Sequence, residues 1–354
     1  MYTVNLVMIV RNEARCLARC LDSIRPWVDT MTVLDTGSTD DTVALATARG
    51  ARVEHFTWVD DFSQARNAAL DLSDADWNLV IDADEWLEAG GPTLQALREQ
   101  TPLWLGSIEV ASHCEGTPGQ HPTTASSWLP RVLPRGVRYE GRVHEQPRFD
   151  GPRQRLSVRV GHDGYQPEQM LAKGVRNQRL LEAAVRAKPD DAYMNYQLGK
   201  DHEVHDRFET AWPFYELALA LVGDDAGRSP SWRHDLLLRS LFVMKATGRL
   251  PEAIRLAEVE MPHWPDSPDF FFVMGDVLLE HAMTHREEAQ AVVPMIEAAW
   301  LQCLAIGENP DLEGAVQGRG SHLAAHNLAS LYETLGRLEE AAQYRALADL
   351  SARA

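Results

Sequence analysis

The chain has 354 residues, a length that suggests two domains at about 150 residues each. Its composition, 45% hydrophobic and 24% charged, is that of a folded protein and excludes extensive disorder. The net charge of −18 repels phosphate backbones and anionic lipid, which argues against nucleic-acid and membrane-surface binding. The four cysteines lack zinc-like spacing, and we find neither a secretory signal nor a run of about 20 apolar residues. We therefore expect a cytoplasmic protein with no membrane span.

The first 90 residues alternate strand-like and helix-like patterns, which predicts βαβ units and a mainly parallel sheet. We expect strands over residues 3–10, 32–34, 52–56 and 77–81. Helices are expected over residues 17–24, from the capping residues 38–41 to Ala48, and over residues 62–72. Ligands of such sheets gather at the carboxyl ends of the strands. Asp35 and Asp82 fall at two of these ends.

Residues 100–165 carry less periodicity and only short strand-like runs such as 158–160, and from about residue 167 the pattern is helical to the end. Counting from Ala192, Leu198 and Gly199 fall at positions 7 and 8, and Ala211, Tyr215 and Ala218 at positions 20, 24 and 27. This spacing resembles the tetratricopeptide repeat. Segments around Gly248, Phe271 and Gly336 repeat the phase, with an insertion expected before Ala298. A helical solenoid is predicted, with an irregular helical bundle as the alternative.

Two carboxylates separated by one residue follow the strand expected at 77–81. Residues i and i+2 of an extended segment face the same way, so Asp82 and Asp84 would address one site while Ala83 points into the core. The bare pattern is weak, since it also occurs at residues 74–76. A buried strand that leads directly into these acids and Glu85 strengthens it, because the acids would repel one another without a cation. The segment therefore favours a divalent-cation site, Mn²⁺ or Mg²⁺.

Four segments, in order, resemble the donor-site motifs of the family 2 glycosyltransferases of GT-A fold: residues 7–13 (VMIVRNE), 33–42 (VLDTGSTDDT), 61–67 (DFSQARN) and 79–85 (LVIDADE). A looser likeness at residues 139–145 (YEGRVHE) and 161–165 (GHDGY) extends it to about residue 165. The resemblance implies an α/β GT-A domain over residues 1–166, a connecting helix over 167–190 and an all-α repeat domain over 191–354. Chains of this layout resemble bacterial transferases that modify peptides, proteins or cell-envelope glycans.

The resemblance implies roles for individual residues. The nucleotide-sugar donor would be bound by Val10, Arg11, Glu13, Asp35, Arg66, Asp82 and Ala83. Asp35 would contact the nucleoside, although it would equally serve to cap the following turn, where Gly37 provides the tight bend. Arg66 would contact the base or the diphosphate, with a surface salt bridge as the alternative.

The resemblance also implies the cation site and the general base. Asp84 would be the main metal ligand and Asp82 would touch the metal edge, while His144 and His162 are candidates to complete the site. Either histidine would otherwise be an ordinary hydrogen-bonded residue. Glu145 or Asp163 would deprotonate the acceptor in inverting transfer.

Other function classes fit less well. A sugar nucleotidyltransferase would carry a glycine-rich loop after its first strand, whereas residues 11–15 (RNEAR) hold no glycine. The Gln-x-x-Arg-Trp signature of membrane-bound polymerising synthases is absent. A non-catalytic repeat scaffold with a degenerate transferase domain remains as the alternative. We expect a glycosyltransferase, with a UDP-sugar favoured by the resemblance and a peptide, protein or glycan acceptor. The repeats would bind that acceptor or a second subunit as in a homodimer, or would serve only to cover the catalytic domain.

Overall fold

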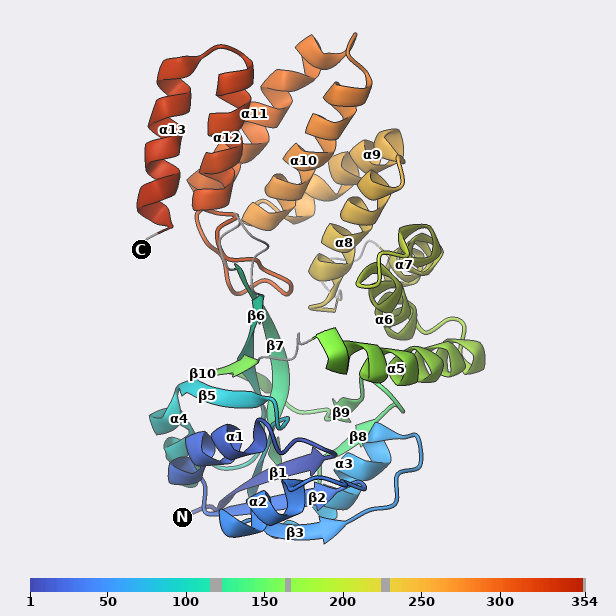
Figure 1. The fold of residues 1–354 in the computed structure, drawn as a ribbon, viewed down its shortest axis with the longest axis vertical. Coiled ribbons are helices and arrows are strands. Elements are labelled where there is room, and N and C mark those ends of the chain that lie inside the picture. Colours follow the sequence, from blue (N-terminus) through green and yellow to red (C-terminus); the bar gives the residue numbers. More distant parts are fainter. Residues whose placement is uncertain (115–122, 163–166, 224–229, 353–354) are drawn as a thin grey trace. The chain divides into compact units, whose positions relative to one another are not determined.

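The computed structural model describes residues 1–114, 123–162, 167–223 and 230–352 (Figure 1). The chain forms two compact units: the first comprises Met1–Glu115 and Ser126–Leu181, and the second comprises Gly116–Ala125 and Glu182–Ala354. The boundary falls inside helix α5 (Pro167–Ala187). The first unit holds the strands and the second is built from helices, so the predicted order of an α/β domain followed by an all-α domain is confirmed.

The first unit is organised around an eight-stranded sheet in the order β3-β2-β1-β4-β7-β6-β10-β5. The strands are β1 (Val4–Val10), β2 (Thr30–Asp35), β3 (Arg52–His55), β4 (Trp77–Val80), β5 (Glu85–Ala89), β6 (Leu105–Cys114), β7 (Thr123–Pro134) and β10 (Arg153–His162). The first four are mutually parallel, as predicted. β7 joins β4 antiparallel, β10 lies parallel to β6, and β5 lies antiparallel to β10. A second, two-stranded sheet pairs β8 (Arg138–Glu140) with β9 (Gln146–Arg148).

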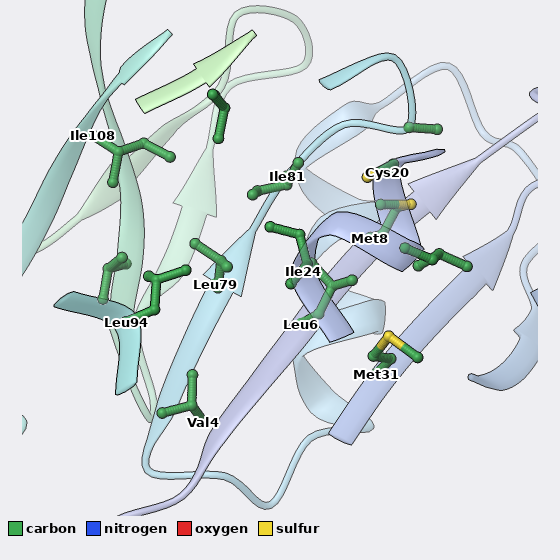
Figure 2. Packing of buried hydrophobic residues seen from close by; sticks show 14 of the residues in the cluster. Val4, Leu6, Met8, Cys20, Ile24, Met31, Leu79, Ile81, Leu94 and Ile108 are labelled. Atoms are coloured by element: carbon green, nitrogen blue, oxygen red, sulfur yellow. The ribbon is translucent and has the colours of Figure 1, made fainter. Parts of the chain in front are cut away.

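Helices cover both faces of the parallel part of the sheet, because alternate residues of β1 point to opposite sides. Leu6 and Met8 pack in one cluster with the apolar stripe of α1 (Leu17–Ile24), as Figure 2 shows for Cys20 and Ile24. Val7 packs on the other side with Leu70 of α3 (Phe62–Asp71). α1 ends where Pro26 opens a short 3₁₀ turn, as the sequence predicts.

Helix α2 (Thr42–Ala48) begins directly after its N-cap residue Asp41, which is one of the predicted capping residues, and ends at Ala48 as predicted. Asp40 accepts hydrogen bonds from the Thr42 backbone N–H and hydroxyl and so closes the turn that precedes the helix. The second half of the sheet differs from the prediction. Residues 105–162 contain long strands where only short runs were expected. In β10 only alternate positions are buried at the centre of the strand, and the exposed positions carry arginine and serine. The run of apolar residues that would predict a long strand is therefore interrupted.

The second unit contains four helix pairs in its described part: α6 (Ala192–Glu203) with α7 (Phe208–Val222), α8 (Arg233–Ala246) with α9 (Leu250–Glu260), α10 (Pro268–Thr284) with α11 (Ala289–Ile306), and α12 (His322–Thr334) with α13 (Leu338–Ser351). Successive pairs contact one another, and Figure 1 shows them following in series. The predicted solenoid is therefore present, and the irregular-bundle alternative is not needed. The expected insertion before Ala298 corresponds to the greater length of α10 and α11, at 17 and 18 residues against 12 and 15 for α6 and α7.

Glycines set the close approach of the paired helices. A Cβ added at Gly199 would lie 2.6 Å from the ring of Tyr215, and one added at Gly275 would lie 2.4 Å from Nε1 of Trp300. Tyr215 and Trp300 are themselves fully buried. The small residue of each pair thus makes room for the aromatic residue of its partner helix, which is the packing that the repeat spacing predicts.

Helix α11 is the one helix in the described part of the chain that is long and apolar enough to cross a membrane by length and composition alone, with a mean hydropathy of 1.4 over 18 residues. Of the residues in this helix, 28% are buried. The buried ones include Ile296, Trp300 and Cys303, which belong to the core shared with α10 and α12. The same composition is found in core helices of soluble proteins, so it decides nothing by itself.

Candidate functional site

The loops that follow β1 and β2 are tied together at the carboxyl edge of the sheet. The Asn12 backbone N–H donates to Oγ of Ser38 at 2.9 Å, and Oδ1 of Asn12 accepts from the Thr39 N–H at 2.7 Å. The Glu13 N–H donates to Oγ1 of Thr42 at 2.8 Å. Asn12 adopts a φ of +56°, a conformation that asparagine tolerates better than most residues. The two loops therefore form one connected wall.

Asp35 lies at the end of β2 and caps the turn that follows. Its carboxylate accepts from the backbone N–H groups of Gly37 and Ser38 at 3.1 Å each, and Nδ1 of His55 lies 3.3 Å away. Burial opposes ionisation, but these hydrogen bonds lower the pKa of Asp35 below its usual value. Gly37 has a φ of +107°, which allows the tight turn. The capping alternative is thus observed, and the predicted nucleoside contact stays a prediction.

The remaining donor-site candidates of the first strand and of the acidic segment occupy different environments. The carbonyl of Val10 accepts from the backbone N–H of Thr36 at 2.9 Å and from its hydroxyl at 3.0 Å. Arg11 is exposed and Glu13 half-buried. Ala83 is 4% exposed and belongs to the core, as the alternation of the segment predicts. Among these, Arg11 offers a side chain to solvent at the end of β1.

An acid and arginine network stands at the end of β4. Arg66 donates from Nη2 to Oδ1 of Asp82 at 2.8 Å, and its Nε is paired with Glu145. Arg131 donates from Nη2 both to Oδ2 of Asp82 and to Oε1 of Glu85, each at 2.8 Å. The Asp82 side chain is 35% exposed, whereas the side chains of Arg66, Arg131, Glu85 and Glu145 are exposed by 10% or less. Each carboxylate oxygen of Asp82 is therefore bound by a guanidinium group, while 35% of the side chain stays exposed to solvent.

Arg131 is a site residue that the sequence did not reveal. It lies in β7, whose residues Val132 and Leu133 pair with Leu79 and Asn78 of β4. That antiparallel pairing carries Arg131 to the acidic segment across nearly 50 residues of sequence. No local pattern marks it, so only knowledge of the strand order would have identified it.

The charges of the network are strongly coupled. Burial opposes ionisation of Asp82, but Arg131 and Arg66 hold its pKa well below the usual range. Burial raises the pKa of Glu85, against the charge of Arg131. Tyr139, whose ring lies 5.6 Å from the Arg66 guanidinium, has its pKa raised to about 12 by burial. Within the described residues, Nη1 of Arg66, Nε of Arg131 and Oη of Tyr139 are buried without a partner, which are positions that water or a ligand oxygen would satisfy.

Asp84 and His162 lie together on the other side of the acidic segment. His162 ends β10, where its backbone pairs with Glu85, and its Nε2 lies 3.8 Å from Oδ2 of Asp84. Oγ of Ser112 lies 3.3 Å from Nδ1 of the same imidazole. Although burial opposes protonation, the negative charge of Asp84 and of the other nearby carboxylates raises the pKa of His162. The described ranges contain no group of three or more histidine, cysteine or acidic side chains arranged as a metal cage.

His144, Glu145 and Asp163 complete the predicted set. His144 lies in the turn between β8 and β9 with a φ of +50°, and its side chain is exposed. Glu145 reaches Arg66, as described above. Asp163 lies outside the described residues. The metal-binding role of His144 and the general-base roles of Glu145 and Asp163 stay predictions.

The fold and the site define a class of protein: an α/β domain with an acidic segment at the edge of its sheet, followed in the chain by a helical repeat solenoid. Residues 5–141 match the family model described as "Glycosyl transferase family 2". The N-terminal domain therefore belongs to glycosyl transferase family 2, as the motifs predict, with a tetratricopeptide-like domain following it.

Relatives agree with this assignment. The chain is 33% identical over 268 residues to a TPR repeat-containing protein of Synechococcus elongatus, covering 72% of this chain and 64% of the relative. It is 28% identical to the prophage-derived glycosyltransferase SunS of Bacillus subtilis, covering 59% of this chain and 51% of SunS. The chain thus spans less than two thirds of the length of either. Glucosyl-3-phosphoglycerate synthase from Mycobacterium tuberculosis, in complex with Mn²⁺ and UDP, is 28% identical over 31% of this chain and 44% of that chain, with a TM-score of 0.27. The family assignment rests on the sequence matches.

Proposed function

We propose that the protein is a metal-dependent glycosyltransferase that moves a sugar from a nucleoside diphosphate donor, with UDP favoured, to a peptide, protein or glycan. The observation that carries the proposal is the acidic segment Asp82-Ala83-Asp84, which follows β4 within a family 2 domain. Arg66 and Arg131 bind Asp82 of this segment and leave its side chain partly exposed. Asp35 and the joined loops after β1 and β2 stand at the same sheet edge.

Asp84 and His162 are the residues that would hold a divalent cation. A carboxylate and an imidazole suit Mn²⁺, and such ions commonly take only one or two protein ligands and fill the remaining positions with phosphate oxygens and water. When bound, the cation would supply charge neutralisation for the departing diphosphate. Two described ligands 3.8 Å apart fit this arrangement better than a closed protein cage would.

Asp82 would serve the donor rather than the cation. Each of its oxygens already accepts from a guanidinium group, and these two positive charges oppose a further cation at the same carboxylate. Its low pKa keeps it ionised at all physiological pH values, ready to accept hydrogen bonds from sugar hydroxyl groups. Glu145 fixes Arg66 in this position, which supports a positioning role; service as a general base would require that pair to open.

Calorimetric titration with UDP-, GDP- and dTDP-sugars, with and without Mn²⁺, tests the proposal. We expect one nucleotide class to bind, and to bind more tightly with the cation present. Hydrolysis of the bound donor can then be followed without knowledge of the acceptor. Absence of binding by every donor under both conditions would rule out the enzyme and favour the non-catalytic scaffold.

The solenoid offers a site for the acceptor. A hollow of about 260 Å³ is lined by helices α6, α8 and α10 and by the segment after α11. It combines apolar surface, such as Phe242 at 40% exposure, with the charged side chains of Lys245, Asp276 and Arg319. Stacked helix pairs form grooves of this kind that suit an extended polypeptide. We infer that an acceptor peptide or protein binds here.

Replacing Phe242 with alanine is expected to lower transfer to an acceptor about tenfold, the cost of losing one well-packed aromatic contact, without changing donor hydrolysis. The measurement is transfer of radiolabelled sugar to the proteins of a cell extract, beside hydrolysis of the same donor. Val259→Ala is the control, since Val259 is 63% exposed on α9 and lies away from the hollow. Equal loss of transfer in both variants, or none in either, would exclude this surface.

A further inference from the structure

Helix α1 holds the start of the turn that carries the acidic segment. β4 ends at Val80 and β5 begins at Glu85, and the turn between them is closed by a hydrogen bond of 3.0 Å from the Glu85 backbone N–H to the Asp82 carbonyl. The same carbonyl accepts from the thiol of Cys20 at 3.5 Å. Cys20 is fully buried in α1, in the core cluster that also contains Ile81 (Figure 2). The beginning of the turn is therefore fastened to this helix.

Helix α1 also holds the chain that follows the turn. β5 is the last strand of the eight-stranded sheet, so one of its edges has no strand beside it. There the Leu87 backbone N–H donates to Oγ of Ser23 at 3.0 Å, and the Ser23 hydroxyl donates to the Cys20 carbonyl at 2.7 Å. Asp84 lies between the two anchors, after Asp82 and before Leu87. The residue that would bind the cation is thus fastened to one helix on both sides.

The indole of Trp86 connects α1 to the strand that carries His162. The guanidinium carbon of Arg19 in α1 lies 3.7 Å from the ring centre of Trp86. On β10, Gly161 pairs with Trp86, and a Cβ added at Gly161 would lie 2.4 Å from Cζ2 of that ring. The ring therefore occupies the space that a side chain at this position would need. His162 is the next residue of β10 and pairs with Glu85, so its position also depends on how β5 is held.

Helix α1 is a well-packed support for these contacts. The residues of its apolar stripe are all fully buried in the core: Leu17, Cys20, Leu21 and Ile24. Asp84, by contrast, lies in a turn, and its Oδ2 is 3.8 Å from Nε2 of His162. A functional site requires its side chains to be held within about 0.5 Å of the productive geometry. Links from a buried helix to both sides of Asp84 supply that constraint.

We propose that Ser23 and Cys20 of α1 are positioning residues of the cation site. They fix the turn that carries Asp84, and Trp86 extends the same constraint to the strand of His162. This inference rests on the proposed function. Both residues act through the backbone of the acidic segment and of β5, so removing either hydrogen bond should weaken the cation although its ligands are unchanged.

Calorimetric titration of the full chain with Mn²⁺, in the presence of UDP, GDP or dTDP, tests the inference. In Ser23→Ala we expect the affinity for Mn²⁺ to fall about tenfold, the lower end of what loss of a residue supporting a metal ligand costs. Binding of the nucleotide without Mn²⁺ should not change. Ser23→Thr keeps the hydroxyl and should restore most of the affinity. Cys20→Ala should act in the same direction but less, because a thiol is a weak donor.

Ser73→Ala is the matched control. Ser73 is half-buried like Ser23, and its Oγ also accepts from a backbone N–H, that of Ala75, at 3.3 Å. Its hydroxyl donates to Oδ1 of Asn78 at 2.6 Å. Ser73 precedes β4, whereas the acidic segment follows that strand. The affinity for Mn²⁺ in Ser73→Ala should therefore equal that of the wild type.

The outcomes separate the inference from the proposed function. A loss in Ser23→Ala that Ser23→Thr restores, with Ser73→Ala unaffected, supports the positioning role. If wild type binds Mn²⁺ and Ser23→Ala binds it equally well, the positioning role is wrong while the transferase proposal stands. If Ser73→Ala loses as much affinity as Ser23→Ala, the effect is a general loss of stability, and the positioning role is again wrong. If wild type binds neither the nucleotides nor Mn²⁺ with them, both proposals fail.

Discussion

Replacing Asp84 with asparagine is expected to abolish the effect of Mn²⁺ on donor binding while the domain stays folded. Asparagine keeps the shape of the side chain but removes the charge that a divalent cation requires. Because Asp84 is only 9% exposed, no other group readily replaces its carboxylate at the cation. The loss of cation affinity should exceed the roughly 10- to 100-fold that removal of a residue supporting a ligand costs. Titration of Mn²⁺ in the presence of the preferred nucleoside diphosphate measures it.

The chain contains its own control for this experiment. Asp74-Ala75-Asp76 repeats the same pattern before β4, and Asp74 is exposed. Asp74→Asn should therefore leave the Mn²⁺ dependence untouched. His162→Gln should weaken the cation less than Asp84→Asn, because it removes a neutral ligand rather than a charge. Unaltered Mn²⁺ dependence in Asp84→Asn would remove Asp84 from the cation site.

The second large effect is expected from replacing Arg131 with methionine. Arg131 is the cation that the described part of the chain places against Glu85, whose side chain is 3% exposed. Its removal leaves a buried carboxylate unpaired, and the free energy of unfolding should fall by about 3–5 kcal/mol. Because burial already raises the pKa of Glu85, the folded protein takes up a proton there more readily than the unfolded chain. The deficit should therefore be fully present above that raised pKa and shrink as pH falls through it toward the pKa of the unfolded chain.

Urea unfolding at several pH values measures this effect. Adding Glu85→Gln to Arg131→Met should restore part of the stability, since it removes the uncompensated charge. Arg135→Met is the matched control one residue beyond β7, where the guanidinium is 56% exposed and lies 3.6 Å from Asp76. An exposed pair of that kind contributes about 0–1 kcal/mol. A loss in Arg131→Met no larger than in Arg135→Met would contradict the proposed importance of the network.

Residues whose position follows from local pattern were predictable from the sequence. Asp35 and Asp82 lie at strand ends because a strand and its following loop are contiguous, and Ala83 is buried because an extended segment alternates. The repeat spacing likewise placed Gly199 against Tyr215. Each of these depends on residues within about 30 positions of one another.

Residues brought together by distant pairing were not predictable. Arg131 reaches Asp82 through the β4–β7 register, and helix α5 is fastened to the loop before α3 by the ion pair of Arg179 with Asp60. Arg66 and Glu145 were each predicted as site residues, but no pattern in the sequence indicates that they form an ion pair with each other. Strand order and helix docking decide such contacts, and neither is encoded in a short window of residues.

The hydrogen bonds that join the loops after β1 and β2 bear on how tightly a nucleotide can bind. Asn12 and Ser38, and Glu13 and Thr42, are linked by backbone donors to side-chain oxygens that are satisfied without any ligand. A wall that is already ordered loses little conformational entropy when the ligand arrives. Preorganisation of this kind would let most of the interaction energy of the proposed nucleotide donor appear as affinity.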